Sequence, residues 1–315
     1  MKNENVIDLL KKMVEGNVLH WKSFWGAIQR ISNKEEFGKD PNRIIKSLMN
    51  ANMFCLGVEI QCPVCTQRSW YSIKDFDYKL QCLKCSESFN IPSNPSKDIK
   101  WSYRAHGPFS LPRGAYGVYS VLLTLKYFSQ PHANSITPIM SFVLKKEQKQ
   151  LEVDLGLFLK EANFGRNKTY LVLAECKTYN HFKKEDIGRM KSLGKQFPGA
   201  ILVFSTLRMS LTEKEKRILR PFVNQGRRSW KAEHPFNPIL ILTGIELFSR
   251  KEPPYCWEKM DGKHKAFVNA NYLIGDIIAL CDVTQQLYLD MKSRFEWYEE
   301  RWARRRQMAV EKHPK

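Results

Sequence analysis

Four of the eight cysteines stand in two pairs, and their spacing constrains the fold of this chain more than any other feature. Cys62 and Cys65 form one pair, Cys82 and Cys85 form the other, and sixteen residues separate the pairs. Two cysteines that flank a two-residue turn can direct both sulfurs at one ion, and zinc prefers four thiolates in a tetrahedron. Two disulfides are the alternative, which the spacing and a reducing compartment disfavour. We therefore predict a structural zinc ribbon without an open catalytic position.

The other four cysteines have no partner at such a spacing. Cys55, Cys176, Cys256 and Cys281 are far apart in the sequence. Free cysteine behaves as a small apolar side chain, so we expect all four to be buried.

The charge of the chain favours a polyanionic partner. It carries 51 Lys+Arg against 32 Asp+Glu, a net charge of +19, and its pI is about 9.5. Nucleic acid is therefore the leading candidate partner. No stretch reaches the roughly 18 consecutive apolar residues that a membrane span requires, so we expect no membrane partner. Lys11 and Lys12 precede any apolar run of signal-peptide length, so we expect a cytoplasmic protein.

Length and periodicity divide the chain into four predicted segments. With 315 residues and 43% hydrophobic content, the chain can bury a sizeable core, and simple disorder is excluded. Apolar residues at helical spacing occur before residue 50, and Asp40 before Pro41 is typical of a helix cap. A turn-rich linker at 92–96 closes the cysteine segment. We predict a helical region over 1–55, the zinc ribbon over 56–96, a nuclease-like domain over 97–250 and a helical extension over 251–315.

The third segment has the pattern of a mixed α/β sheet. A buried helix is expected within 114–128, and strands are expected at 139–144, 151–159, 170–176, 200–204 and 239–243. Between the third and fourth strands, Ile187, Met190 and Leu193 should face the core of a helix. Thr212 and Glu215 match a capping box for the next helix. Near the end of the chain, apolar residues from Leu280 to Trp302 predict one long amphipathic helix that leads into an arginine-rich run.

Acidic residues interrupt two of these apolar strands. Asp154 lies in the second strand, and Glu175 and Lys177 lie in the third. Side chains alternate along a strand, so Glu175 and Lys177 share one face while Cys176 points to the other. If the two strands are neighbours, Asp154 and Glu175 converge. Carboxylate oxygens bind Mg²⁺, and a lysine beside the attacking water suits phosphodiester hydrolysis.

Asp154 followed after some twenty residues by Glu175, Cys176 and Lys177 resembles the motif of the PD-(D/E)XK nuclease superfamily. The resemblance covers about 114–248 and implies a restriction-endonuclease-like core that cleaves DNA with Mg²⁺ or Mn²⁺. It implies that Asp154 and Glu175 bind the metal, that Cys176 offers its backbone carbonyl, and that Lys177 is the catalytic lysine. The chain departs from the superfamily pattern in having Val153 where a proline often precedes the aspartate. It also has no acidic residue within 116–128.

Two basic residues after Lys177 are candidate DNA contacts. Lys183 lies before the next predicted helix and Arg189 lies within it, and neutralisation of phosphates supplies much of the affinity for DNA. A solvated helix face is the alternative for both residues.

Three functions account for this sequence. The first is a Mg²⁺-dependent endonuclease that acts on DNA, alone or as a homodimer or with a partner protein. A zinc ribbon joined to a nuclease domain is similar to effectors of bacterial defence against phage and foreign DNA, although repair or junction resolution stays open. The second is a non-catalytic adaptor that binds nucleic acid on a degenerate nuclease fold. The third, a zinc-ribbon factor of transcription or translation, leaves the acidic strands unexplained.

Overall fold

The computed structural model describes residues 4–33, 40–91, 100–111, 117–129, 135–146, 149–163, 166–229, 237–249, 251–269 and 274–312. The chain forms two compact units, which divide between Tyr119 and Ser120. The predicted linker at 92–96 lies outside the described residues, and the four predicted domain limits stay predictions. Among the described residues, no helix is both long and apolar enough to cross a membrane.

The first unit combines three helices with a four-stranded antiparallel sheet. The helices are α1 (Glu4–Lys11), α2 (Trp21–Ser32) and α3 (Pro41–Asn50). The strand order is β1 (Val18–His20), β6 (Lys100–Ala105), β2 (Phe54–Gln61) and β3 (Arg68–Ser72). Two short 3-10 helices belong to the same unit: η1 (Ile73–Asp75) follows β3 along the chain, and η2 (Gly107–Ser110) follows β6. The ring of Phe24 on α2 stacks on Tyr103 of β6 with centroids 3.8 Å apart, which fixes helix to sheet. The predicted cap is confirmed, since Asp40 accepts the N–H of Asn42 at 2.9 Å.

The four paired cysteines meet in a small ribbon of this unit, as predicted. Two matching turns carry them, one between β2 and β3 and the other between β4 (Lys79–Gln81) and β5 (Ser88–Asn90). In each turn the residue after the second cysteine is left-handed, Thr66 at φ 63° and Ser86 at φ 62°, and its N–H donates to the carbonyl of the first cysteine at 2.9 Å. The four sulfurs lie within 4.8 Å of one another. This arrangement is consistent with a zinc ribbon.

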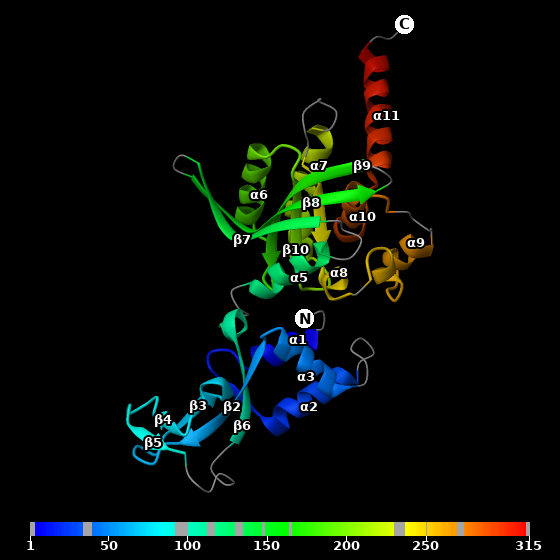
Figure 1. Ribbon diagram of the computed structural model, residues 1–315. Coiled ribbons are helices and arrows are strands. Elements are labelled where there is room, and N and C mark those ends of the chain that lie inside the picture. The colour runs from blue at the N-terminus through cyan, green and yellow to red at the C-terminus, as the bar shows by residue number, and fades with distance from the viewer. Residues whose placement is uncertain are drawn as a thin grey trace. The chain divides into compact units, whose positions relative to one another are not determined.

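A five-stranded mixed sheet forms the centre of the second unit (Figure 1). Its strand order is β11 (Ile239–Leu242), β10 (Ile201–Thr206), β9 (Arg166–Lys177), β8 (Lys149–Asn163) and β7 (Ser135–Lys146). Strands β7, β8 and β9 form an antiparallel meander, whereas β10 and β11 run parallel to β9. The mixed α/β fold and all five predicted strands are therefore confirmed. Strands β10 and β11 are buried along their whole length, which explains their continuous apolar sequences.

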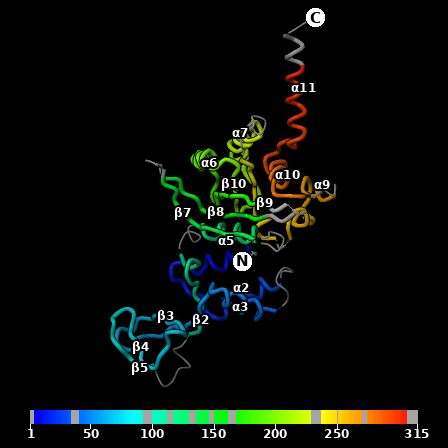
Figure 2. Tube along the Cα trace, turned by 45° about the horizontal axis from the view of Figure 1, so that its top comes forward, coloured from blue at the N-terminus to red at the C-terminus, as the bar shows by residue number. Residues whose placement is uncertain are grey.

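Helices cover both faces of this sheet. Thr124 of α5 (Val118–Phe128) donates to Ser205 of β10 at 2.7 Å, so α5 lies on the face to which Cys176 points. The opposite face carries α6 (Lys184–Gln196) and α7 (Glu213–Ser229), where Phe222 packs edge-on against Phe204. The remaining elements are α8 (Gly244–Phe248), η3 (Tyr255–Trp257), α9 (Lys263–Asn269), α10 (Ile277–Leu289) and α11 (Arg294–Lys312), and Figure 2 follows their path.

The prediction of one long C-terminal helix was wrong. The helix stops at Leu289, and Asp290 adopts the left-handed conformation with φ 52° and ψ 40°. Asp290 also pairs with Lys216 at 2.8 Å, which holds the break against α7. A new helix starts at Arg294, four residues after Asp290, and Ser293 caps it together with Glu296. Both α10 and α11 carry apolar residues at helical spacing, so periodicity alone does not reveal the break between them.

The prediction that the four unpaired cysteines are buried is confirmed for two of them. Cys176 and Cys281 are buried, whereas Cys55 and Cys256 are only half-buried. All eight cysteines are free thiols.

Candidate functional site

Asp154 and Glu175 lie near each other where the pairing of two neighbouring antiparallel strands ends. The register of β8 and β9 runs to the pair Leu155–Ala174, and Asp154 and Glu175 are the next residues of the two strands. One Asp154 carboxylate oxygen accepts the backbone N–H of Cys176 at 2.7 Å. Besides burial, the charge of Asp154 raises the pKa of Glu175. The neighbouring strands therefore bring the two carboxylates into one environment.

Alternation along β9 separates the motif into two environments. Cys176 is buried beneath α5, where its thiol contacts the hydroxyl of Thr124 at 3.7 Å. Burial and the nearby Asp154 raise the pKa of the Cys176 thiol to about 12, so it stays protonated. Glu175 and Lys177 occupy the other face, below α6. The thiol is thus part of the core, and only the backbone of Cys176 borders the acidic site.

On the α6 side, two acids and two cations form a compact ion-pair network. The Lys177 ammonium lies 2.7 Å from Glu175 Oε1 and 3.1 Å from Asp186 Oδ1. Arg189 Nη2 pairs with Glu175 Oε2 and lies 3.1 Å from Asp186 Oδ1. The Glu175 side chain is 2% exposed and that of Asp186 is 8% exposed, whereas Lys177 and Arg189 are 22% and 24% exposed. The cations therefore separate the buried acids from solvent.

The electrostatics of Asp154 and Glu175 favour a cation. Burial raises the pKa of Asp154, against the opposing effects of the Cys176 N–H and of Lys177. Burial also raises the pKa of Glu175, and the nearby Asp154 charge raises it further. Burial by itself lowers the pKa of Lys177, but its contacts with Glu175 and Asp186 raise it overall, so the ammonium is held charged. Two buried acids with raised pKa values are stabilised by additional positive charge.

Asp186 is the member of the network that the sequence reasoning missed. It occupies the third position of α6, where its Oδ2 accepts the N–H of Lys183 at 2.8 Å as half of a capping box. Burial opposes its ionisation, but the N–H of Lys183 and the ammonium of Lys177 outweigh burial and lower its pKa. The sequence does carry a signal for Asp186, because an acidic residue at the third position of a helix is typical of a capping box.

The two predicted DNA contacts differ in their placement. Lys183 is exposed and precedes α6, and its backbone N–H binds Asp186. Arg189 instead turns inward to Glu175 and Asp186, so the structure brings it to the acidic site. Contact of either residue with phosphate stays a prediction.

A second buried acid, Glu215, fixes the loop that follows β9. Its carboxylate accepts the N–H of Phe182 at 2.8 Å and that of Thr212 at 2.9 Å, and it pairs with Arg208. The predicted capping box between Thr212 and Glu215 is therefore confirmed. His181 contacts the same carboxylate at 3.3 Å, which accounts for this histidine without a role in proton transfer. Glu215 thereby links the N-terminus of α7 to the chain between Lys177 and α6.

A shared metal site needs at least three side chains whose ligand atoms lie close together. Among the described residues, the four paired cysteines meet this condition. Backbone N–H groups of Cys85 and Lys84 lower the pKa of the Cys82 thiol to about 6, whereas the N–H of Glu87 is outweighed by burial and the neighbouring sulfurs, which raise the pKa of the Cys85 thiol to about 12. Asp154 and Glu175 offer two carboxylates, and α5 has no acid to add to them.

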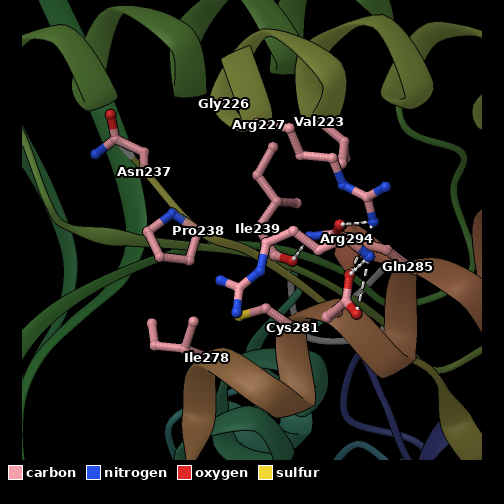
Figure 3. Close-up of a pocket in the computed structure, with 11 residues that line it drawn as sticks. Val223, Gly226, Arg227, Asn237, Pro238, Ile239, Ile278, Cys281, Gln285 and Arg294 are labelled. Carbon is pink, nitrogen blue, oxygen red and sulfur yellow. Dashed lines mark hydrogen bonds and ion pairs between the residues drawn. The ribbon is translucent and has the colours of Figure 1, made fainter. Parts of the chain in front are cut away.

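A small cavity of about 30 Å³ lies away from the acidic network, between α7, the start of β11 and α10 (Figure 3). Its volume admits about two water molecules. Arg227 on its wall donates to the carbonyl of Lys292 at 2.8 Å, to Asp282 at 2.9 Å and to Gln285 at 3.0 Å. These bonds tie α7 to α10 and to the segment before α11. The cavity belongs to that joint and is too small for a substrate.

Comparison with known proteins gives limited information. No protein-family model matches the chain, and no curated protein matches it. The chain has partial structural similarity to a solved structure described as "MspJI Restriction Endonuclease in Complex with 27-mer Oligonucleotide". The identity is 16%, the TM-score is 0.26, and the match covers 54% of this chain and 31% of that chain. At that TM-score the similarity carries no argument about function, which must come from the site.

Proposed function

We propose that this protein is a metal-dependent endonuclease that hydrolyses DNA phosphodiester bonds. The observation that carries the proposal is the contact of Asp154 on β8 with the motif on β9, where it accepts the Cys176 N–H at 2.7 Å, with the Lys177 ammonium 2.7 Å from the adjacent Glu175. Two carboxylates and one ammonium in this arrangement suit phosphodiester hydrolysis, because they hold a hard cation and orient a nucleophile.

The donor set fits Mg²⁺ or Mn²⁺. Asp154 and Glu175 supply carboxylate oxygens, and the Cys176 backbone carbonyl is the proposed third ligand. When bound, the ion neutralises charge that develops on the scissile phosphate and lowers the pKa of water. Lys177 orients the attacking water and donates to a phosphate oxygen, while Asp186 holds its ammonium in place at 3.1 Å. Arg189 is positioned to contact phosphate once its hold on Glu175 is released.

The cysteine cluster and the basic surface residues complete the proposed function. The four-cysteine cluster binds structural zinc, and the basic surface of the chain, with Lys183 and Arg189, holds the DNA backbone. Action as a homodimer or with a partner protein, in defence against phage or foreign DNA, is the biological setting that we propose.

The decisive experiment is cleavage of single- and double-stranded DNA and of RNA by the full chain with Mg²⁺ or Mn²⁺. Asp154→Asn, Glu175→Gln and Lys177→Met each preserve side-chain size, and each should lower the rate of DNA cleavage by at least about a hundredfold. Glu152→Gln is the matched control, because Glu152 is an exposed acid two residues before Asp154 on the same strand. Unchanged thermal unfolding establishes that the variants fold. Equal cleavage by the wild type and the three variants, or no cleavage of any substrate, would overturn the proposal.

One observation favours the second function, a non-catalytic adaptor. Both oxygens of Glu175 already pair with cations, Lys177 on one and Arg189 on the other, so the buried acid is balanced without a metal. An adaptor would bind DNA equally with and without divalent cations, and it would be indifferent to Glu175→Gln. Calorimetric titration with Mn²⁺ separates the two functions, because only the nuclease requires a site at Asp154 and Glu175.

A further inference from the structure

The first unit contains a groove whose lining is basic and free of acids. The groove has a volume of about 350 Å³ and lies between the end of α1 and α2, which contact each other. Lys12, Lys22 and Arg30 supply its charges, while Leu9, Leu19, Ser23, Gly26 and Ala27 complete its lining. All eight residues belong to the first unit, so the groove does not depend on the second unit.

Its three cations are not neutralised by the protein. Lys12, Lys22 and Arg30 are exposed, and within the described part of the chain none of them pairs with a carboxylate. Asp8, the acid of α1 nearest in sequence to Lys12, pairs instead with Lys11 at 2.9 Å. The Arg30 Nε donates to the Gly26 carbonyl at 3.2 Å, which lays the guanidinium along the groove. Three unbalanced positive charges around a concave surface attract an anion.

The shape of the groove suits an extended polyanion. Lys22 and Arg30 are eight residues apart on α2, which places them two turns and about 12 Å apart along the helix axis. Between them the wall is made of small residues, and a Cβ added at Gly26 would meet nothing within 4 Å. A ligand backbone can therefore approach α2 closely between two cationic ends. A single small anion would contact only one of these ends.

We propose that this groove is a second nucleic-acid contact, which binds the phosphate backbone of DNA without reading its sequence. The identity of the ligand rests on the proposed nuclease function, because that function supplies a phosphodiester substrate. The location of the contact rests on the groove alone. Its cations neutralise phosphates, and such contacts position a protein on DNA without specifying bases.

The test compares two double variants of the full chain that remove equal charge from neighbouring helices. Lys22→Gln with Arg30→Gln alters the groove, and Arg43→Gln with Lys46→Gln alters exposed residues of α3. Affinity for a double-stranded oligonucleotide is measured by fluorescence anisotropy across a salt series without Mg²⁺, Mn²⁺ or chelator, so that cleavage plays no part and the zinc cluster stays intact. The logarithm of the association constant falls linearly with the logarithm of the salt concentration, and each lost phosphate contact should make this slope shallower by about 0.9. At 0.1 M salt, the loss of one contact corresponds to a roughly eightfold lower affinity.

We expect the slope of log K against log salt to become shallower by about 1.8 in the groove variant and by much less in the α3 variant. Gly26→Leu fills the groove without changing charge, and it should also weaken binding by at least about fivefold while circular dichroism stays unchanged. If the two double variants bind alike, or if Gly26→Leu binds like the wild type, the groove is no DNA contact. If the groove variant loses affinity for poly-L-glutamate and not for DNA, the ligand is an acidic peptide and the proposal is wrong.

These outcomes are independent of the proposed nuclease activity. Failure of cleavage with Mg²⁺ would overturn the nuclease while leaving the binding series without Mg²⁺ or Mn²⁺ to decide the groove. Cleavage that depends on Asp154, together with equal binding by both double variants, would overturn the groove alone.

Discussion

Glu175 is the residue at which the two functions of the candidate site compete. The proposed nuclease function requires its buried carboxylate as a metal ligand, yet Lys177 and Arg189 hold its two oxygens. Lys177 reaches it from the same strand two residues away, whereas Arg189 reaches it from α6. A metal ion that binds Glu175 must therefore displace at least one cation, and the side chain from the helix is the one that can withdraw without moving the sheet.

Replacing Arg189 by Met should strengthen metal binding. The change removes a cation that competes for Glu175, so we expect the Kd for Mn²⁺ at pH 8 to fall roughly tenfold, which is about 1.4 kcal/mol. Isothermal titration calorimetry measures this directly. Lys191→Met, an exposed site on the same helix, is the control and should leave the Kd unchanged. Weaker binding in Arg189→Met would show that the arginine organises the site and does not compete for it.

Glu215 gives a prediction about pH and stability. Burial opposes its ionisation, but bonds from Arg208, Thr212 and Phe182 lower its pKa from 4.5 to about 2. The pKa is lowered in the folded state, so the stabilisation is fully present above about pH 4.5 and is lost as pH falls toward 2. The size of the shift corresponds to about 3 kcal/mol of unfolding free energy.

Glu215→Gln should therefore lower the unfolding free energy by roughly 3 kcal/mol at pH 7, and the difference should shrink below pH 4. Urea unfolding at several pH values measures it, and amide exchange at Phe182 reports the loop locally. Glu213→Gln is the control, because Glu213 lies on the same helix turn and is exposed. If the difference in unfolding free energy between Glu215→Gln and the wild type stays constant between pH 7 and pH 3, the ionised form of Glu215 is not what stabilises the fold.

Among the elements, the cysteine ribbon is the one that cannot hold itself together by packing. Its buried core consists of a few side chains, two of which are cysteines of the cluster: Val58, Ile60, Cys62, Tyr71, Leu80, Cys82 and Phe89. A core of this size supplies little stabilisation, and in small metal-binding folds the free energy of metal binding is the free energy of folding.

Purified protein should therefore contain one zinc ion per chain, and its removal should unfold the ribbon. Cys65→Ser should abolish stoichiometric zinc, measured by atomic emission, and expose the amides of 62–90 to exchange. Cys55→Ser is the control, because Cys55 lies on β2 outside the cluster. Equal protection of these amides in zinc-free and zinc-loaded protein would show that the metal is not structural.

At the scale of the whole molecule, the proposed function gives the net charge of +19 and the acidic site separate tasks. In that proposal the charge attracts DNA over a broad surface, whereas cleavage requires a few residues of one sheet. Attraction to DNA falls with salt because it is electrostatic.

Binding and cleavage should accordingly be separable. Without Mg²⁺, Mn²⁺ or chelator, the Asp154→Asn, Glu175→Gln double variant should bind DNA at least as tightly as the wild type, because it removes two negative charges beside a phosphate site. It should not cleave with Mg²⁺. Anisotropy measures binding and gel electrophoresis measures cleavage. A double variant that loses affinity by tenfold or more would show that the acids support the DNA-binding surface itself.

The sequence by itself determined the features that depend on local spacing. The two cysteine pairs, the five strands, the caps at Asp40 and Thr212, and the placement of Cys176 opposite Glu175 and Lys177 all follow from periodicity or fixed offsets within a few residues. Only the tertiary structure brought Asp186 and Arg189 to Glu175, opened the groove between α1 and α2, and broke the C-terminal helix at Asp290. These depend on which elements pack together, and a contact between residues distant in sequence leaves no period in the chain.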